Sequence, residues 1–191
     1  MPETMTPRER FAAVVNSQPF DRLPLVEWAM WWDKTIDRWH GEGLPAELTD
    51  RYELYRYFGL ELYMQDWLRA ASTQTPRAAF HGGPIIENMD DYERIRPTLY
   101  RDDAVDLELW RKRASLQASG EAVLWLTLEG FFWFPRVLLG IEPHFYAFVD
   151  QPELLHRIND DLANWHLRMI DAVATVCTPD FITVAEDMSY N

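Results

Sequence analysis

Cysteine is nearly absent from this chain, and there is no excess of basic residues. The single cysteine, Cys177, excludes an internal disulfide and a cysteine-rich metal site. Acidic residues number 31 against 18 lysines and arginines, and the net charge of -13 argues against nucleic acid or an anionic membrane as partner, since both need a basic face. No apolar run approaches the roughly 20 residues that span a bilayer, and the opening residues lack the apolar core of a signal peptide. We therefore expect a soluble, cytoplasmic protein with no nucleic-acid or membrane partner.

Several common ligand-binding and catalytic motifs are missing too. The sequence has no glycine-rich phosphate loop and no Gly-x-Ser-x-Gly nucleophile elbow. The five histidines show no pairing four residues apart and no neighbouring cysteine, so we expect no metal site in this chain. His166 lies off the apolar stripe of its helical segment, which predicts a surface side chain.

Four short apolar stretches alternate with helical patterns along the 191 residues. The strand candidates are residues 25–28, 60–64, 122–128 and 181–185, and the last of these is typical of a buried parallel strand. Strands that alternate with helices indicate parallel βαβ units and an α/β fold. No repeat, low-complexity segment or linker divides the chain, so residues 1–191 are predicted to form a single domain.

Capping residues and apolar periodicity mark the helices. Thr6, Pro7 and Glu9 form a capping box that predicts a helix start. A long final helix is predicted to start at a second box formed by Asp150 and Glu153. Its apolar stripe comprises Leu154, Ile158, Leu162, Trp165, Met169, Val173 and Val176. Residues 72–87, with two prolines and two glycines, are predicted to be either irregular or a β-excursion.

An acidic residue lies near the end of every predicted strand or just after it. Because parallel strands bring their C-terminal ends to one edge of a sheet, we expect these carboxylates to converge, and clustered carboxylates raise one another's pKa and suit acid–base chemistry. We predict Asp66, Glu186 and Asp187 as catalytic residues, and Glu27 and Glu129 as substrate-binding residues. The alternative is that acids are common at strand ends because these ends lie near solvent.

Nine tryptophans are many for this length. Trp28, Trp31, Trp32 and Trp39 lie close together in the sequence, and residues 131–134 form a second aromatic group. One interpretation is a pocket for a flat, hydrophobic or macrocyclic ligand, with Trp28 and Trp31 as substrate-binding candidates. The alternative, which we favour for most of these rings, is core packing between helices and sheet.

Five segments, residues 6–25, 57–60, 136–142, 148–155 and 180–188, resemble the uroporphyrinogen decarboxylase superfamily and run in the order of that family. The resemblance implies a TIM (β/α)8 barrel. It also implies either decarboxylation of uroporphyrinogen in haem synthesis or corrinoid-linked methyl transfer to a thiol with the help of zinc. By position, Asp66 matches the catalytic aspartate with which the decarboxylases hold pyrrole N–H groups. The decarboxylase arginines are missing from residues 26–35, so the sequence is nearer to the methyltransferase branch.

A complete barrel takes about 250 residues, whereas four predicted strands make about half of one. We therefore expect the N-terminal half of a cobalamin-linked methyltransferase-type enzyme, without a complete active site of its own. Its partners would be a small-molecule substrate and either the missing C-terminal half or a second copy in a homodimer. The chain itself is expected to hold no cofactor, while zinc and a corrinoid are those of a full-length relative. The alternatives are true uroporphyrinogen decarboxylase activity and a non-catalytic half-barrel that serves in binding or assembly.

Overall fold

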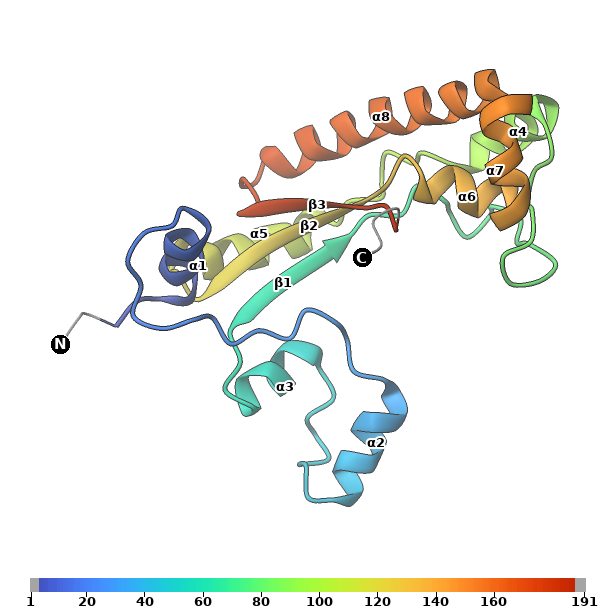
Figure 1. The fold of residues 1–191 in the computed structure, drawn as a ribbon. Coiled ribbons are helices and arrows are strands. Elements are labelled where there is room, and N and C mark those ends of the chain that lie inside the picture. The colour runs from blue at the N-terminus through green and yellow to red at the C-terminus, as the bar shows by residue number, and fades with distance from the viewer. Residues whose placement is uncertain (1–3, 188–191) are drawn as a thin grey trace. The chain divides into compact units, whose positions relative to one another are not determined.

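The computed structural model describes residues 4–187, which form an α/β fold (Figure 1). The helices are α1 (Pro7–Val15), α2 (Asp33–Gly41), α3 (Arg51–Tyr57), α4 (Met89–Ile95), the 3-10 turn η1 (Arg96–Thr98), α5 (Leu107–Ala118), α6 (Trp133–Leu139), α7 (Ile141–Asp150) and α8 (Pro152–Ala174). The strands are β1 (Leu62–Trp67), β2 (Ala122–Glu129) and β3 (Phe181–Ala185).

The sheet of the described residues is open and has three parallel strands in the order β1-β2-β3. The prediction of four parallel strands in half of a TIM barrel is therefore wrong, because residues 25–28 form no strand. The Leu25 carbonyl accepts one backbone hydrogen bond, from Glu61 at 2.8 Å, while the Leu25 and Val26 side chains are 55% and 40% exposed. Two apolar residues after Pro24, which has no N–H to donate, bury too little surface to hold a strand there.

The chain divides into two compact units. Unit 1 comprises Met1–Gln65 and Arg111–Trp125, and unit 2 comprises Asp66–Trp110 and Leu126–Asn191. The boundaries fall inside β1, α5 and β2. The single domain expected from the sequence stays a prediction.

In unit 1, the capping box at the start of α1 is confirmed. The Thr6 hydroxyl accepts from the Glu9 backbone N–H at 3.2 Å, and the Glu9 carboxylate accepts from the Thr6 N–H at 2.8 Å. Farther along this helix, the guanidinium of Arg10 is buried and donates to both carboxylate oxygens of Asp21 and to Glu61. A buried cation is tolerated because two carboxylates pair with it, and the pairing ties α1 to the residue that precedes β1.

In unit 2, α8 supplies more buried hydrophobic residues than any other helix. Six members of its predicted stripe are confirmed as buried, namely Leu154, Ile158, Leu162, Trp165, Met169 and Val173. The predicted cap at Asp150 is wrong, because α7 runs to Asp150 and the N-cap of α8 is Gln151, which makes no side-chain cap hydrogen bond. Pro152, whose fixed φ suits the first helical turn, marks the start instead.

The strands differ in burial. Every residue of β2 is buried, as the central position of this strand in the sheet requires. β3 alternates between half-buried and exposed residues, with Ile182 42% and Val184 45% exposed, so the expectation of a fully buried strand is wrong. β3 is an edge strand of the described sheet and packs through one of its faces. On that face the hydroxyl of Thr183 in β3 lies 3.0 Å from the hydroxyl of Thr127 in the neighbouring strand β2.

The irregular loop predicted at residues 72–87 is confirmed, and its end is attached to the junction of α6 and α7. Ile85 donates its backbone N–H to the Leu138 carbonyl at 2.7 Å, and Ile141 donates to the Gly82 carbonyl at 3.0 Å. A long loop without regular structure is thereby held against two helices far away in the sequence.

Gly140→Ala is expected to destabilise unit 2 by about 1–3 kcal/mol, the cost of forcing a side chain into a conformation that only glycine adopts easily. Gly140 has φ 83° and ψ 163°, and an added Cβ would lie 2.9 Å from the Pro84 nitrogen. Gly41→Ala is the control, because nothing lies within 4 Å of its Cβ position. Urea unfolding of both variants tests this, and equal midpoints would contradict the role assigned to Gly140.

Candidate functional site

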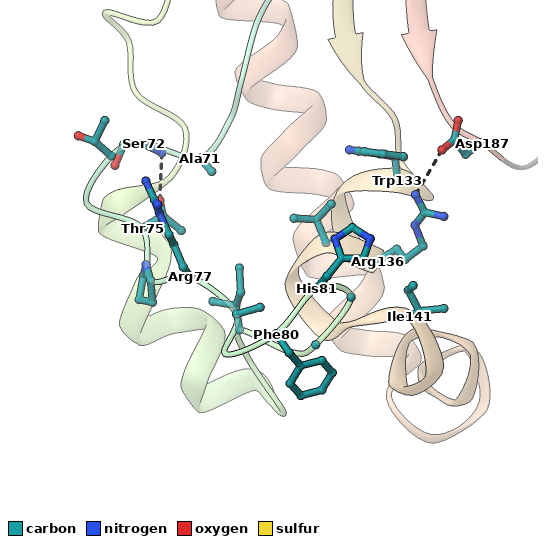
Figure 2. A pocket seen from close by; sticks show the side chains of 17 residues that line it. Ala71, Ser72, Thr75, Arg77, Phe80, His81, Trp133, Arg136, Ile141 and Asp187 are labelled. Atoms are coloured by element: carbon teal, nitrogen blue, oxygen red, sulfur yellow. Dashed lines mark hydrogen bonds and ion pairs between the residues drawn. The ribbon is translucent and has the colours of Figure 1, made fainter. Parts of the chain in front are cut away.

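A cavity of about 730 Å³ opens in unit 2 beside the ends of β2 and β3 (Figure 2). Its walls are formed by Ala71, Ser72, Thr73, Thr75, Pro76, Arg77, Ala78, Phe80, His81, Gly82, Gly83, Ile85, Trp133, Arg136, Val137, Ile141 and Asp187. They come from the irregular loop, from α6 with the first residue of α7, and from the chain just after β3. The volume lies in the range typical of small-molecule sites, and the ends of parallel strands are where α/β proteins commonly bind ligands.

The cavity carries more positive than negative charge. Arg77, Arg136 and His81 line it together with one acid, Asp187. The Arg136 guanidinium lies over the Trp133 ring at 4.4 Å from its centroid, and its NH2 group lies 3.4 Å from a carboxylate oxygen of Asp187. Neither Arg77 nor His81 forms a hydrogen bond or ion pair with any residue between 4 and 187. In a chain with a net charge of -13, this local excess of cations favours an anionic ligand.

The acids predicted at the ends of β1 and β2 have partners of their own. Asp66 lies within β1, not after it, and its carboxylate accepts the indole N–H of Trp110 at 2.8 Å. Glu129 ends β2, is 5% exposed, accepts the Ala70 backbone N–H at 2.8 Å and lies 3.6 Å from the Arg69 guanidinium. Burial raises the pKa of Glu129, whereas these two hydrogen-bonding neighbours oppose the rise. Neither Asp66 nor Glu129 lines the cavity.

Glu186 joins the end of β3 to the start of α6. Its carboxylate accepts the backbone N–H groups of Phe131 at 2.9 Å, Phe132 at 2.8 Å and Trp133 at 3.3 Å. Gly130 is needed beside it, because an added Cβ there would lie 2.1 Å from a Glu186 carboxylate oxygen. The side chain thus satisfies backbone donors at the start of α6 that have no helical partner.

Asp187 is the one predicted catalytic residue that lines the cavity. Its φ of 55° is left-handed, a conformation that aspartate adopts more readily than most residues, and its carboxylate faces Arg136 (Figure 2). The carboxylates of Asp66, Glu129 and Glu186 each bind a different partner, and none of the three residues lines the cavity.

Glu27, Trp28 and Trp31 belong to unit 1, whereas the cavity belongs to unit 2. The Glu27 carboxylate accepts the Ala29 backbone N–H at 3.2 Å, and Trp28 is 72% exposed. Trp31 makes edge-to-face contacts with three rings, those of Trp39, Tyr55 and Phe58. For Trp31 the geometry matches the alternative of core packing, and none of the three residues lines the cavity.

The surface position predicted for His166 is wrong. His166 is 5% exposed and packs against the rings of Trp165 and Phe131. α8 packs on α6 and α7, so its buried face is wider than the apolar stripe and includes this histidine. Burial lowers the pKa of His166 to about 4, although the negative charge of Glu186 acts in the opposite direction. Burial and the charge of Arg136 lower the pKa of His144, which is 1% exposed.

The cationic residues of the cavity were not among the candidates from sequence. Arg136 lies in a segment that resembles the uroporphyrinogen decarboxylase superfamily, which was the one signal for it. Arg77 and His81 lie in the loop interrupted by proline and glycine, where no periodicity indicates which side chains face a ligand. The available signal was basic residues in a long irregular loop of an acidic chain.

No protein-family model, curated protein or solved structure matches the chain. The similarity to the uroporphyrinogen decarboxylase superfamily therefore rests on the sequence segments alone. Within residues 4–187, no three histidine, cysteine, aspartate or glutamate side chains are grouped so that they could hold a metal ion. In the same part of the chain, no helix combines the length and apolarity needed to cross a membrane.

The stability of the fold is expected to fall as the pH decreases from 6.5 towards 4, in part because of His166. Its folded-state pKa of about 4 is below the ordinary value of 6.5, so the unfolded chain takes up the proton first. The contribution of neutral His166 to the free energy of unfolding is therefore fully present above pH 6.5. By pH 4.5, protonation of this residue in the unfolded chain has lowered the free energy of unfolding by about 2–3 kcal/mol.

Urea unfolding at pH 7.0 and 4.5 measures this loss. His166→Gln should flatten the decline, while His156→Gln, a change at an exposed histidine of the same helix, should leave it unchanged. Equal declines in wild type and His166→Gln would show that His166 does not titrate in this way.

Proposed function

We propose that this chain is a ligand-binding component of an enzyme of the uroporphyrinogen decarboxylase type, and that its cavity binds an anionic small molecule. The segments that resemble this superfamily supply part of the cavity wall. Residues 136–142 contribute Arg136, Val137 and Ile141, and residues 180–188 contribute Asp187. Two of the five resembling segments therefore line the cavity.

One observation carries the proposal: two arginines line a cavity that is large enough for a small-molecule ligand. A guanidinium presents a planar fork of donors that matches carboxylate and phosphate oxygens. The Trp133 ring restrains Arg136, whose side chain is 22% exposed, and its ion pair with Asp187 is long at 3.4 Å. A ligand carboxylate can take the place of Asp187 with shorter, better aligned hydrogen bonds.

Two reaction classes follow from the resemblance, namely corrinoid-linked methyl transfer and decarboxylation of a porphyrinogen carboxylate. The absence of arginines from residues 26–35 favours the methyltransferase branch. The cavity nevertheless contains two arginines, Arg77 and Arg136, which come from other segments of the chain. This cationic lining favours a carboxylate-bearing substrate. The described residues offer no group of three histidine, cysteine, aspartate or glutamate side chains that could hold a metal ion, so no step is assigned to zinc.

A non-catalytic binding role is the second candidate, and the acids of the strand ends favour it. The carboxylates of Asp66, Glu129 and Glu186 are engaged by an indole N–H or by backbone N–H groups of the chain itself. Asp187 and His81 are then the cavity groups that remain to carry a proton. A site with these groups is equipped to hold an anion more clearly than to transform it.

Arg136→Gln is expected to weaken the binding of citrate about 10- to 100-fold, because a charge-assisted hydrogen bond contributes about 1.5–3 kcal/mol. Isothermal titration calorimetry measures the affinity. Arg38→Gln removes the same charge from an exposed side chain of α2 and should bind citrate as the wild type does. Absence of citrate binding to the wild type, or equal affinity of Arg136→Gln, would refute the anion site.

Asp187→Asn is expected to strengthen citrate binding about 3- to 10-fold, because it removes the carboxylate that competes for Arg136. Asp37→Asn, at an exposed position in α2, changes the net charge by the same amount and serves as the control. The same calorimetric titration compares the two variants. If Asp187→Asn binds citrate no more tightly than Asp37→Asn, the competition between Asp187 and ligand does not occur.

A further inference from the structure

The two arginines of the cavity come from different elements and lie apart. Arg77 belongs to the irregular loop, and Arg136 to α6. Figure 2 shows them on opposite sides of the cavity, with the His81 ring between them. Arg136 has Asp187 as a counterion, whereas Arg77 has no ion pair or hydrogen bond within residues 4–187.

A single ligand carboxylate that replaces Asp187 at Arg136 would leave Arg77 without a partner among residues 4–187. One anionic group is fully served by one guanidinium, since a carboxylate accepts two parallel N–H bonds from one fork. Two guanidinium groups on opposite walls therefore match two anionic groups better than one. Besides these polar groups, the cavity is lined by apolar side chains, among them Ala78, Phe80 and Val137. Such a lining suits a hydrocarbon or aromatic spacer.

The backbone around the cavity fixes the separation of the two walls. At one end of the loop, the Thr75 hydroxyl accepts the Ser72 backbone N–H at 3.0 Å (Figure 2). The same hydroxyl donates to the Thr98 carbonyl at 3.1 Å. At the other end, Ile141 donates to the Gly82 carbonyl at the start of α7. Because the segment that bears Arg77 is attached on both sides, it can select among ligands by length.

We infer that the cavity binds a dianion whose two carboxylate or phosphate-type groups, joined by an apolar spacer, bridge Arg77 and Arg136. This inference rests on the proposed function, because it needs an anion at Arg136. It adds the substrate class, and it makes Arg77 a residue that determines specificity.

Calorimetric titration with α,ω-dicarboxylates from malonate to suberate tests the inference, with monocarboxylates of the same carbon number alongside. One dicarboxylate length should bind at least 10-fold more tightly than its monocarboxylate. Bisphosphonates with the same spacers distinguish the two anion types, and the stronger series identifies the anionic group of the ligand.

Two variants assign the ends of the ligand. Arg77→Gln should reduce the preferred dianion to the affinity of the monoanion and leave the monoanion unchanged, while Arg136→Gln should weaken both. Lys34→Gln, at an exposed position of α2, controls for the loss of one positive charge. Arg77 is exposed and unpaired within the described residues, so its replacement should preserve the fold, which the urea midpoint verifies.

The outcomes separate the two proposals. Equal affinity for monoanions and dianions, with no effect of Arg77→Gln, would overturn the bridging inference while the anion site at Arg136 stands. Failure of every anion to bind would overturn both. A dianion that binds more tightly but responds equally to Arg77→Gln and Lys34→Gln would show a general charge effect and would also overturn the bridging inference.

Discussion

The carboxylate of Glu186 accepts three backbone hydrogen bonds from residues 131–133, and the arrangement of the cavity depends on this contact. It connects the residue after β3 to the chain that leaves β2, and the Gly130 N–H extends the connection to the Ala185 carbonyl at 2.9 Å. The direction of α6 is thereby set at its first turn. Arg136 and Asp187 follow from opposite sides of the same contact, so their meeting in the cavity is a consequence of it.

This dependence separates two roles that acidic residues play at the ends of parallel strands. A carboxylate that accepts several backbone N–H groups stabilises the fold, as Glu186 illustrates. Asp187 instead faces the cation of Arg136 at a longer distance of 3.4 Å, and it is this carboxylate that we propose a ligand displaces. The sign of the charge at a strand end therefore says little about function until the partners of each group are known.

The parts of the fold that could be predicted are those encoded by local patterns. The capping box of α1, the stripe of α8 and the strand at residues 122–128 each require only neighbouring residues to be recognised. The prediction failed where the outcome depends on distant contacts. Residues 25–28 have strand-like composition but make one backbone hydrogen bond, and His166 is buried because α6 and α7 cover a wider face of α8. The cationic site was missed because a loop and a helix far apart in sequence form it.

The resemblance to the uroporphyrinogen decarboxylase superfamily has a different value for the fold and for the site. The barrel that it implies is not what residues 4–187 form, since the described sheet is open and three-stranded. Yet two of the resembling segments contribute Arg136 and Asp187 to one cavity. Function depends on the groups that a site presents, and unrelated frameworks can present the same groups. An arginine held by a tryptophan ring, with an exchangeable carboxylate beside it, is sufficient to recognise an anion on an open sheet as well as in a barrel, because the interaction requires only the fork, the charge and partial exclusion of water.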